Sequence, residues 1–125
     1  AAFALLFENT FSDEGMEAVL RDAEEAQTLP EDEFALSLAT GAAEKQEELD
    51  QKIAAASDRW KMDRISRVAL TVMRLALYEV LYCDEIPVNV SLNEAVELTK
   101  IYGGDEEASF VNGVLGNLAR SIREN

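Results

Sequence analysis

The feature that most constrains this chain is the run ISRVALTVMRLALYEVLY, residues 65–82. When the run is drawn as a helix, apolar side chains occupy most of its faces, and few charged residues mark a solvent side. A helix of that kind belongs at the centre of a domain, where other helices cover it. The run therefore predicts a central buried helix, which the pair Ile86–Pro87 then ends, because a residue before proline disfavours helical geometry.

The remaining segments predict further helices. Apolar residues recur every three or four positions along them, and no alternating strand pattern of useful length appears. Pro30 is expected to open a long helix that reaches Ile53, with Gly41 as a point of close contact. Ser91 and Glu94 match the S-x-x-E capping box and predict a helix start there. The sequence therefore predicts an all-α fold.

The composition suits one domain over residues 1–125. The chain has 125 residues, of which 48% are hydrophobic, enough for a sizeable core. No apolar run approaches the ~20 residues of a membrane span. A single cysteine, Cys83, and the absence of histidine argue against disulfides and zinc. We therefore expect a cytoplasmic protein in a reducing compartment, with no metal and no cofactor.

Charge divides the chain into two unequal halves. Residues 1–58 hold 3 basic and 15 acidic residues, whereas residues 59–125 hold 8 and 10, within a net charge of −14. The acidic half favours a solvated helix surface. The second half opens with a cluster of basic residues, namely Arg59, Lys61, Arg64, Arg67 and Arg74. Composition alone leaves open whether that cluster binds anything.

Nothing in the sequence predicts catalysis. Without histidine, and with its one cysteine in an apolar helix, the chain lacks the commonest members of nucleophile–base pairs. The stretch GGDEE, residues 103–107, predicts a turn and a helix start, because its acids would repel phosphate. No P-loop or dinucleotide fingerprint is present. We expect a protein that is not an enzyme.

The last helix carries two unexpected glycines in FVNGVLGNLAR, residues 110–120. Each costs about 1 kcal/mol relative to alanine inside a helix. Gly113 borders the apolar stripe, which predicts close packing against a neighbouring helix. Gly116 lies further out and leaves Asn117 and Arg120 accessible, so either a partner presses closely there or the glycine is merely tolerated.

Three motifs carry a family resemblance. VMRLALYEVLY, IPVNVSLNEAVELTKIYG and FVNGVLGNLA resemble the NusB transcription antitermination factors, in that family's order and spacing. The family's first helix is matched by AAFALLFE. Its long third helix and the start of its second half are matched by EFALSLATGAAEKQEELDQKI and then Trp60. The resemblance covers nearly the whole chain. It implies about seven helices in two packed, roughly perpendicular helical bundles.

The resemblance also implies a function without catalysis. NusB proteins bind the boxA element of nascent RNA together with NusE, a ribosomal small-subunit protein, and the complex makes RNA polymerase read through terminators, notably in ribosomal RNA operons. The family's arginine-rich arm is expected directly before Ala1, outside the sequence as given. Two alternatives stay open: a NusB-like RNA-binding domain of a ribosomal RNA methyltransferase, and a homodimeric protein-interaction module.

The resemblance implies roles for individual residues near the RNA. Phe7 matches an aromatic beside the arm, where it either stacks on a base or fills the core. Glu79 matches a carboxylate near both RNA and NusE. Many family members carry an acidic residue at the place of Gly116, which puts an RNA-side role of that position in doubt. The expected RNA surface comprises Phe7, Glu79, Gly116, Asn117 and Arg120.

The same resemblance predicts a protein-partner surface on the central helix. Arg74 and Tyr78 share the motif VMRLALYE with Glu79. All three residues are assigned to the face that meets NusE.

Overall fold

The computed structural model describes residues 2–57 and 64–124, and this part of the chain contains helices and no strand. The elements in chain order are α1 (Ala2–Asn9), α2 (Met16–Glu25), α3 (Glu33–Glu44), α4 (Gln46–Ser57), α5 (Arg67–Tyr82), α6 (Val88–Gly103) and α7 (Asp105–Glu124). The predicted all-α class with about seven helices is confirmed.

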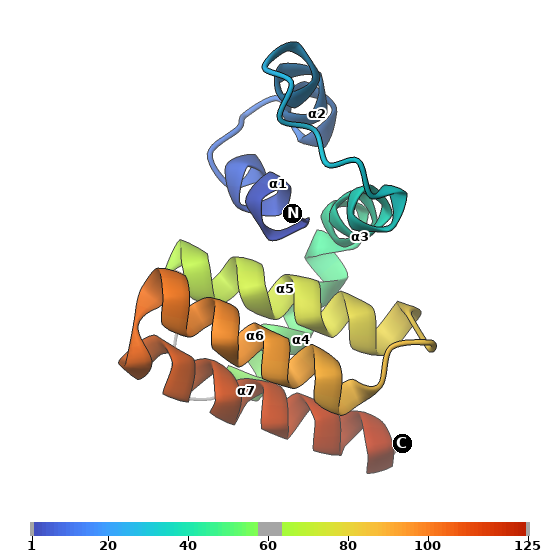
Figure 1. The fold of residues 1–125 in the computed structure, drawn as a ribbon. Helices are drawn as coiled ribbons and strands as arrows, with labels where there is room; N and C mark the ends of the chain where they lie inside the picture. The colour runs from blue at the N-terminus through green and yellow to red at the C-terminus, as the bar shows by residue number, and fades with distance from the viewer. Residues whose placement is uncertain (1, 58–63, 125) are drawn as a thin grey trace.

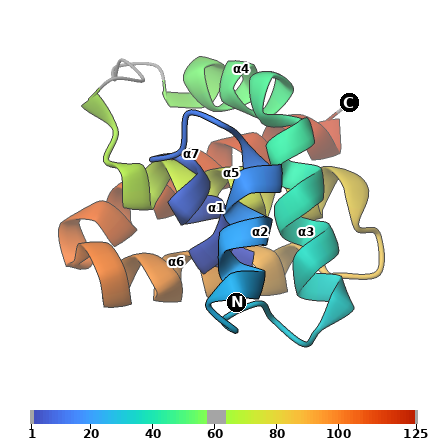
Figure 2. The same ribbon diagram turned by 90° about the horizontal axis from the view of Figure 1, so that it is seen from above.

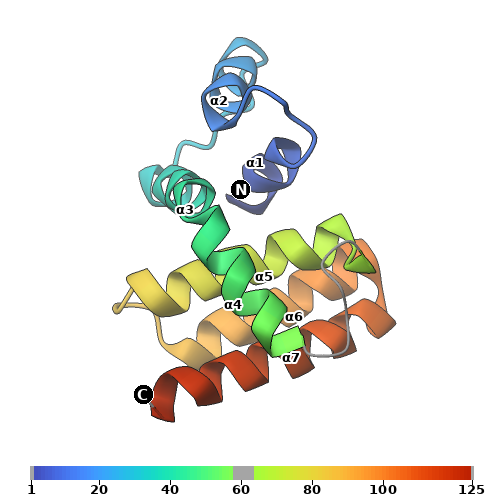
Figure 3. The same ribbon diagram turned by 180° about the vertical axis from the view of Figure 1, so that it is seen from behind.

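The helices form two groups that run across each other. Helices α5, α6 and α7 lie side by side, and α1 and α3 rest on α5 and are seen nearly end-on in the same view (Figure 1). Helix α2 packs on α1, on the side of α1 that faces away from α5 (Figures 1 and 2). Helix α4 descends from the end of α3 and packs against α5 and α7 (Figure 3). This arrangement agrees with the two roughly perpendicular bundles that the sequence predicts.

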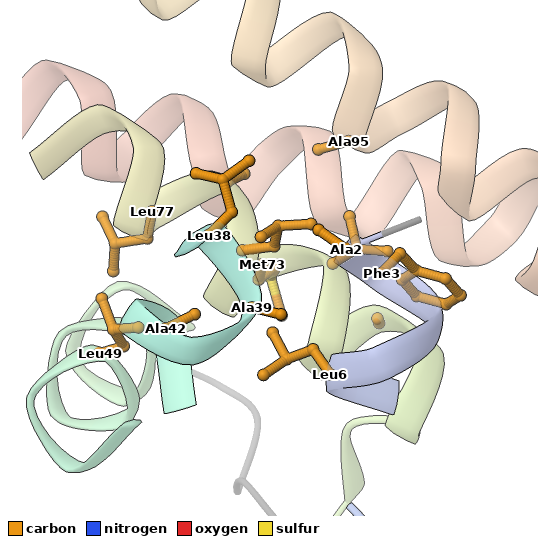
Figure 4. Close-up of a cluster of buried hydrophobic side chains, with 14 of the residues drawn as sticks. Ala2, Phe3, Leu6, Leu38, Ala39, Ala42, Leu49, Met73, Leu77 and Ala95 are labelled. Atoms are coloured by element: carbon orange, nitrogen blue, oxygen red, sulfur yellow. The ribbon is translucent and has the colours of Figure 1, made fainter. Parts of the chain in front are cut away.

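Helix α5 is central, as its all-round apolar pattern predicts. The Ser66 side chain caps it by accepting a hydrogen bond from the Ala69 backbone N–H at 3.1 Å. Met73 and Leu77 are fully buried and belong to one core cluster that draws residues from all seven helices. Side chains of α1, α3, α4 and α6 meet α5 within that cluster (Figure 4).

The long helix predicted from Pro30 to Ile53 is wrong in two respects. Helix α3 begins only at Glu33, where the Asp32 carboxylate accepts a hydrogen bond from the Phe34 backbone N–H at 2.9 Å. Lys45, with φ −98° and ψ 12°, then separates α3 from α4. The change of direction at Lys45 lets α4 reach α5 and α7, so tertiary packing overrides a continuous apolar periodicity.

The capping box predicted at Ser91 and Glu94 is also wrong. Helix α6 begins at Val88, directly after Pro87, so Ser91 lies inside the first turns of the helix. The Ser91 hydroxyl is buried and donates a hydrogen bond to Glu79 Oε1 of α5 at 3.1 Å. The Ser91 side chain, which the local pattern assigns to a helix cap, therefore bonds to Glu79 of another helix.

The division into halves at residue 58 stays a prediction. Residues 58–63, which include Arg59, Trp60 and Lys61, lie outside the described residues. Helix α4, from the acidic half, packs on α5 and α7 of the other half. In the described part of the chain, no helix combines the length and apolarity needed to cross a membrane.

Candidate functional site

Arg74 is held inside the molecule by an acid of α4. Its Nε lies 2.7 Å from Asp50 Oδ1, and its Nη2 donates to Asp50 Oδ2 at 2.8 Å. The Arg74 side chain is 9% exposed, against 27% for Asp50. This bidentate contact ties α4 to α5. It requires the planar guanidinium of arginine, which can donate two parallel hydrogen bonds to one carboxylate. The assignment of Arg74 to a partner surface stays a prediction, and the contact with Asp50 gives the residue a clear packing role.

Tyr78 lies one turn further along α5 and faces α3. A Cβ added to Gly41 would overlap the hydroxyl and ring of Tyr78, so the predicted close contact at Gly41 is confirmed. The Tyr78 ring packs 5.1 Å from that of Tyr82, whose hydroxyl donates to the Glu48 carboxylate, 2.7 and 2.8 Å from its two oxygens. Burial raises the pKa of Tyr78, and the hydrogen bond to Glu48 raises the pKa of Tyr82.

Glu79 points to a different side of α5. Its carboxyl is buried and accepts the hydrogen bond from Ser91 of α6. Burial raises the pKa of Glu79, the Ser91 hydrogen bond lowers it, and the neighbouring carboxylate of Glu94 raises it further. Glu79 is therefore an acid whose ionised form the fold stabilises poorly.

Glu79 lines an open groove, the α1–α6 groove, which is bounded by α1, α3, α5 and α6. Large apolar side chains that are substantially exposed stand along it, namely Phe34 (43%), Val90 (44%) and Ile101 (71%). Its polar lining includes four acids and no base: Asp32, Glu79, Glu94 and Glu97. A lining that combines exposed apolar side chains with acids matches a protein segment with apolar and basic side chains.

Phe7 is half-buried and belongs to a row of rings along α1. Its ring stacks on Phe3 at 5.5 Å and meets Phe11 edge-on at 5.2 Å. It also packs against the core cluster. One side of Phe7 therefore serves packing, and its role toward RNA stays a prediction.

The predicted close packing at Gly113 is wrong. A Cβ added there would have nothing within 4 Å among residues 2–57 and 64–124. The buried stripe of α7 runs through Val111, Val114, Leu115 and Leu118, so position 113 faces away from the neighbouring helices. Open space, rather than a helix contact, surrounds this glycine.

Gly116 lies on the outer side of α7 with Asn117 and Arg120. A Cβ at Gly116 would meet only Arg120 Nη1, at the ordinary contact distance of 3.7 Å. Arg120 Nη2 donates to Asn117 Oδ1 within the same helix. These residues line an open pocket together with Ala56 and Ser57 at the end of α4. Nothing in the described part of the chain seals the pocket, and its role toward RNA stays a prediction.

The structure separates the predicted site residues into distinct surfaces. Arg74 and Tyr78 face α4 and α3, whereas Glu79 opens toward the groove, and the α7 residues lie on another side. Reasoning from the sequence missed the groove itself. One signal was available, because Val90, Glu94, Glu97 and Ile101 recur at spacings of three and four along α6.

Comparisons with known proteins agree on one family. The family model described as the NusB family matches residues 1–120. The transcription antitermination protein NusB of Bacillus subtilis strain 168 is 42% identical over 124 residues, which cover 98% of this chain and 92% of that protein. The protein of the same name from Bacillus velezensis is 50% identical over 91 residues, covering 73% of this chain and 70% of that protein.

Solved structures share the fold. NusB of T. maritima superposes with a TM-score of 0.82 and 34% identity, over 95% of this chain and 85% of that one. A crystal structure of the antitermination factors NusB and NusE in complex with dsRNA gives a TM-score of 0.83 at 24% identity, over 96% and 91% of the two chains. At that identity the second likeness speaks to the fold alone.

Proposed function

This chain belongs to the NusB family, and we propose that it is a transcription antitermination factor that binds boxA-type RNA together with NusE. In this proposal the complex promotes read-through by RNA polymerase, notably in ribosomal RNA operons, acts in the cytoplasm and performs no catalysis. The observation that carries the proposal is the 42% identity to the Bacillus subtilis protein over 98% of this chain. The fold shared with the NusB chain of a NusB–NusE–dsRNA complex supports it.

We assign NusE to the α1–α6 groove. Its exposed apolar residues give a partner surface to bury, and its four acids would attract basic side chains. Glu79, which lines the groove, offers carboxylate oxygens as hydrogen-bond acceptors.

Arg74 and Tyr78 act on the same surface from behind. Tyr78 sits against Gly41 of α3, and other α3 residues form one wall of the groove, among them Phe34 and Leu38. Arg74 ties α5, another wall of the groove, to α4 through Asp50. We therefore propose that these two residues position the groove and do not touch the partner.

RNA is assigned to two other surfaces. Phe7 offers an aromatic ring on α1, and Asn117 and Arg120 offer a donor-rich patch on α7. A glycine at position 116 places no carboxylate beside Arg120, which reduces repulsion of phosphate there. Because the chain carries a net charge of −14, we expect the RNA to depend on NusE for full affinity.

Fluorescence anisotropy tests the proposal with full-length protein and a labelled single-stranded boxA-type RNA. We expect NusE to tighten binding and added salt to weaken it, since phosphate contacts release counterions. Glu94→Lys in the groove should weaken the NusE-dependent gain, whereas Glu17→Lys on the exposed side of α2 should not. An affinity that responds neither to NusE nor to salt would contradict the proposal.

A further inference from the structure

Four aromatic rings form a continuous row across α6 and α1. The Tyr102 ring stacks on Phe3 with centroids 5.0 Å apart and planes at 22°. Phe3 stacks on Phe7, and Phe7 meets Phe11 in the turn after α1. The guanidinium of Arg67, the first residue of α5, covers the Phe11 ring at 4.2 Å from its centroid. We call these five residues the aromatic row.

The two ends of the aromatic row are open to solvent while its middle is packed. Phe3 is 8% exposed and lies at the edge of the buried cluster (Figure 4). Phe11 is 61% exposed and Tyr102 is 59% exposed. Core packing accounts for Phe3, but it does not account for two large rings that keep most of their surface in water.

Positive charge gathers at the Phe11 end of the row. Arg67 and Arg64 are both exposed and lie three residues apart, just before and at the start of α5. Among residues 2–57 and 64–124, neither forms an ion pair with a carboxylate. In the described part of the chain neither guanidinium is therefore held by an ion pair, and Arg64 lines a pocket with Glu106 and Glu107.

We propose that the aromatic row is a stacking strip for the bases of single-stranded RNA, with Tyr102 and Phe11 as its contact rings and Arg67 as its phosphate contact. The inference rests on the proposed function and deepens it, because it adds residues of α5, α6 and the α1–α2 turn to the RNA surface. Phe7 and Phe3 connect the two exposed rings through an unbroken series of ring contacts.

Chemistry favours RNA over a protein as the ligand of this strip. Stacked rings next to a guanidinium present flat π-faces, which match nucleobases whatever their sequence. Because the net charge of −14 opposes a polyanion, affinity for RNA must draw strongly on stacking. The α1–α6 groove has the opposite character, with four acids in its lining, and is the surface suited to a protein.

Aromatic-to-aliphatic substitutions test the stacking rings. In anisotropy titrations of full-length protein with NusE and labelled boxA-type RNA, Tyr102→Leu and Phe11→Leu should each weaken RNA affinity by about fivefold or more. Tyr102→Phe and Phe11→Tyr, which keep a ring, should bind within about twofold of wild type. Tyr82→Leu is the matched control, since Tyr82 is an exposed tyrosine (44%) on another side, and it should leave RNA affinity unchanged.

Salt dependence tests the phosphate contact. Arg67→Gln should weaken binding and lower the slope of log K against log salt by about 1. Arg21→Gln removes an exposed charge from α2, away from the row, and should leave the slope as it is.

The outcomes separate this inference from the proposed function. If wild-type protein binds no boxA-type RNA even with NusE, the proposed function fails and the inference fails with it. If wild type binds and the folded leucine variants bind equally well, the aromatic row is packing only and the inference alone is overturned. Loss of NusE binding with RNA affinity intact would mark the row as a protein surface and also overturn it. Thermal melts check folding, and should Phe11→Leu not fold, Tyr102→Leu decides the question.

Discussion

Two parts of the molecule use an arginine and a glycine in opposite ways. One is the contact of α5 with α3 and α4, and the other is the outer face of α7. On α5, Arg74 grips Asp50 of another helix and Tyr78 fills the space left by Gly41. On α7, Arg120 hydrogen-bonds to Asn117 of its own helix, and Gly113 borders open space within the described part of the chain. An arginine thus ties two helices together on α5 but stays within its own helix on α7, and a glycine of α3 meets a tyrosine ring whereas a glycine of α7 meets open space. What stands opposite the residues makes the difference.

The largest effect on stability should come from breaking the Arg74–Asp50 ion pair. We expect Arg74→Ala to lower the free energy of unfolding by about 3 kcal/mol, because it leaves the Asp50 carboxylate without its partner beneath α5. Urea denaturation measures this. Arg120→Ala, which removes an exposed arginine from α7, should change stability by less than about 0.5 kcal/mol.

An Arg74→Ala protein that kept its stability and lost NusE binding would reverse our view of that residue. It would show that Arg74 acts on the partner directly.

The glycine contact should give the next largest effect. In Gly41→Ala the new methyl group overlaps the Tyr78 ring and hydroxyl, so the ring must move away from α3. We expect a loss of about 1–3 kcal/mol from overpacking, reduced by a helix-propensity gain of up to about 1 kcal/mol. Denaturation with and without a second change, Tyr78→Phe, identifies the clash. If removing the hydroxyl restores none of the loss, the clash lies with the ring itself.

Glu79 should make stability depend on pH. Its pKa is raised from 4.5 chiefly by burial, so the folded state holds the proton more tightly than the unfolded chain. The contribution of Glu79 to stability is therefore present below the ordinary glutamate pKa and is lost as pH rises through the raised pKa. We expect Glu79→Gln, whose amide oxygen still accepts from Ser91, to raise the melting temperature more at pH 7 than at pH 4.

Equal shifts at the two pH values would show that the charge of Glu79 costs the fold nothing. Glu17→Gln on α2, which removes an exposed acid, is the control for the change in net charge.

The smallest effect should lie on α7. Gly113→Ala adds a methyl group to open space, and we expect it to stabilise the helix by up to about 1 kcal/mol. Gly116→Ala should act similarly, since its methyl group reaches only Arg120 at an ordinary distance. Thermal melts measure both changes. Ternary-complex titrations with NusE and RNA then test whether this face of α7 binds a partner. If both stabilised variants assemble as well as wild type, the two glycines are merely tolerated.

The helices were predictable in kind but not in their ends. All-round apolarity located α5, and turn and breaker residues separated α6 and α7. The break at Lys45 and the role of Ser91 escaped prediction because each depends on a distant partner, whereas the start of α3 at Glu33 follows from the local cap by Asp32. Lys45 breaks the helix so that α4 reaches α7, and Ser91 serves Glu79 in place of its own helix start.

The candidate site was predictable as a set of residues and not as a set of surfaces. Arg74, Tyr78 and Glu79 follow one another in a single motif, and helical geometry alone places residues 74 and 78 on one face and residue 79 on the next. Which neighbour occupies each face is a matter of how α3, α4 and α6 pack on α5. The α1–α6 groove and the aromatic row are each assembled from distant segments, so the sequence showed at most the α6 side of the groove.

Local chemistry along the chain was enough to specify helices, a single core and membership of a family, because apolar spacing and motif order are properties of neighbours in sequence. Which neighbour each polar or glycine residue meets was decided only by the assembled fold. Gly41 and Gly113 illustrate this, since both stand in amphipathic helices and only one has a ring against it. Long-range packing chooses the neighbour, and the neighbour sets whether a missing side chain is a contact or an empty space.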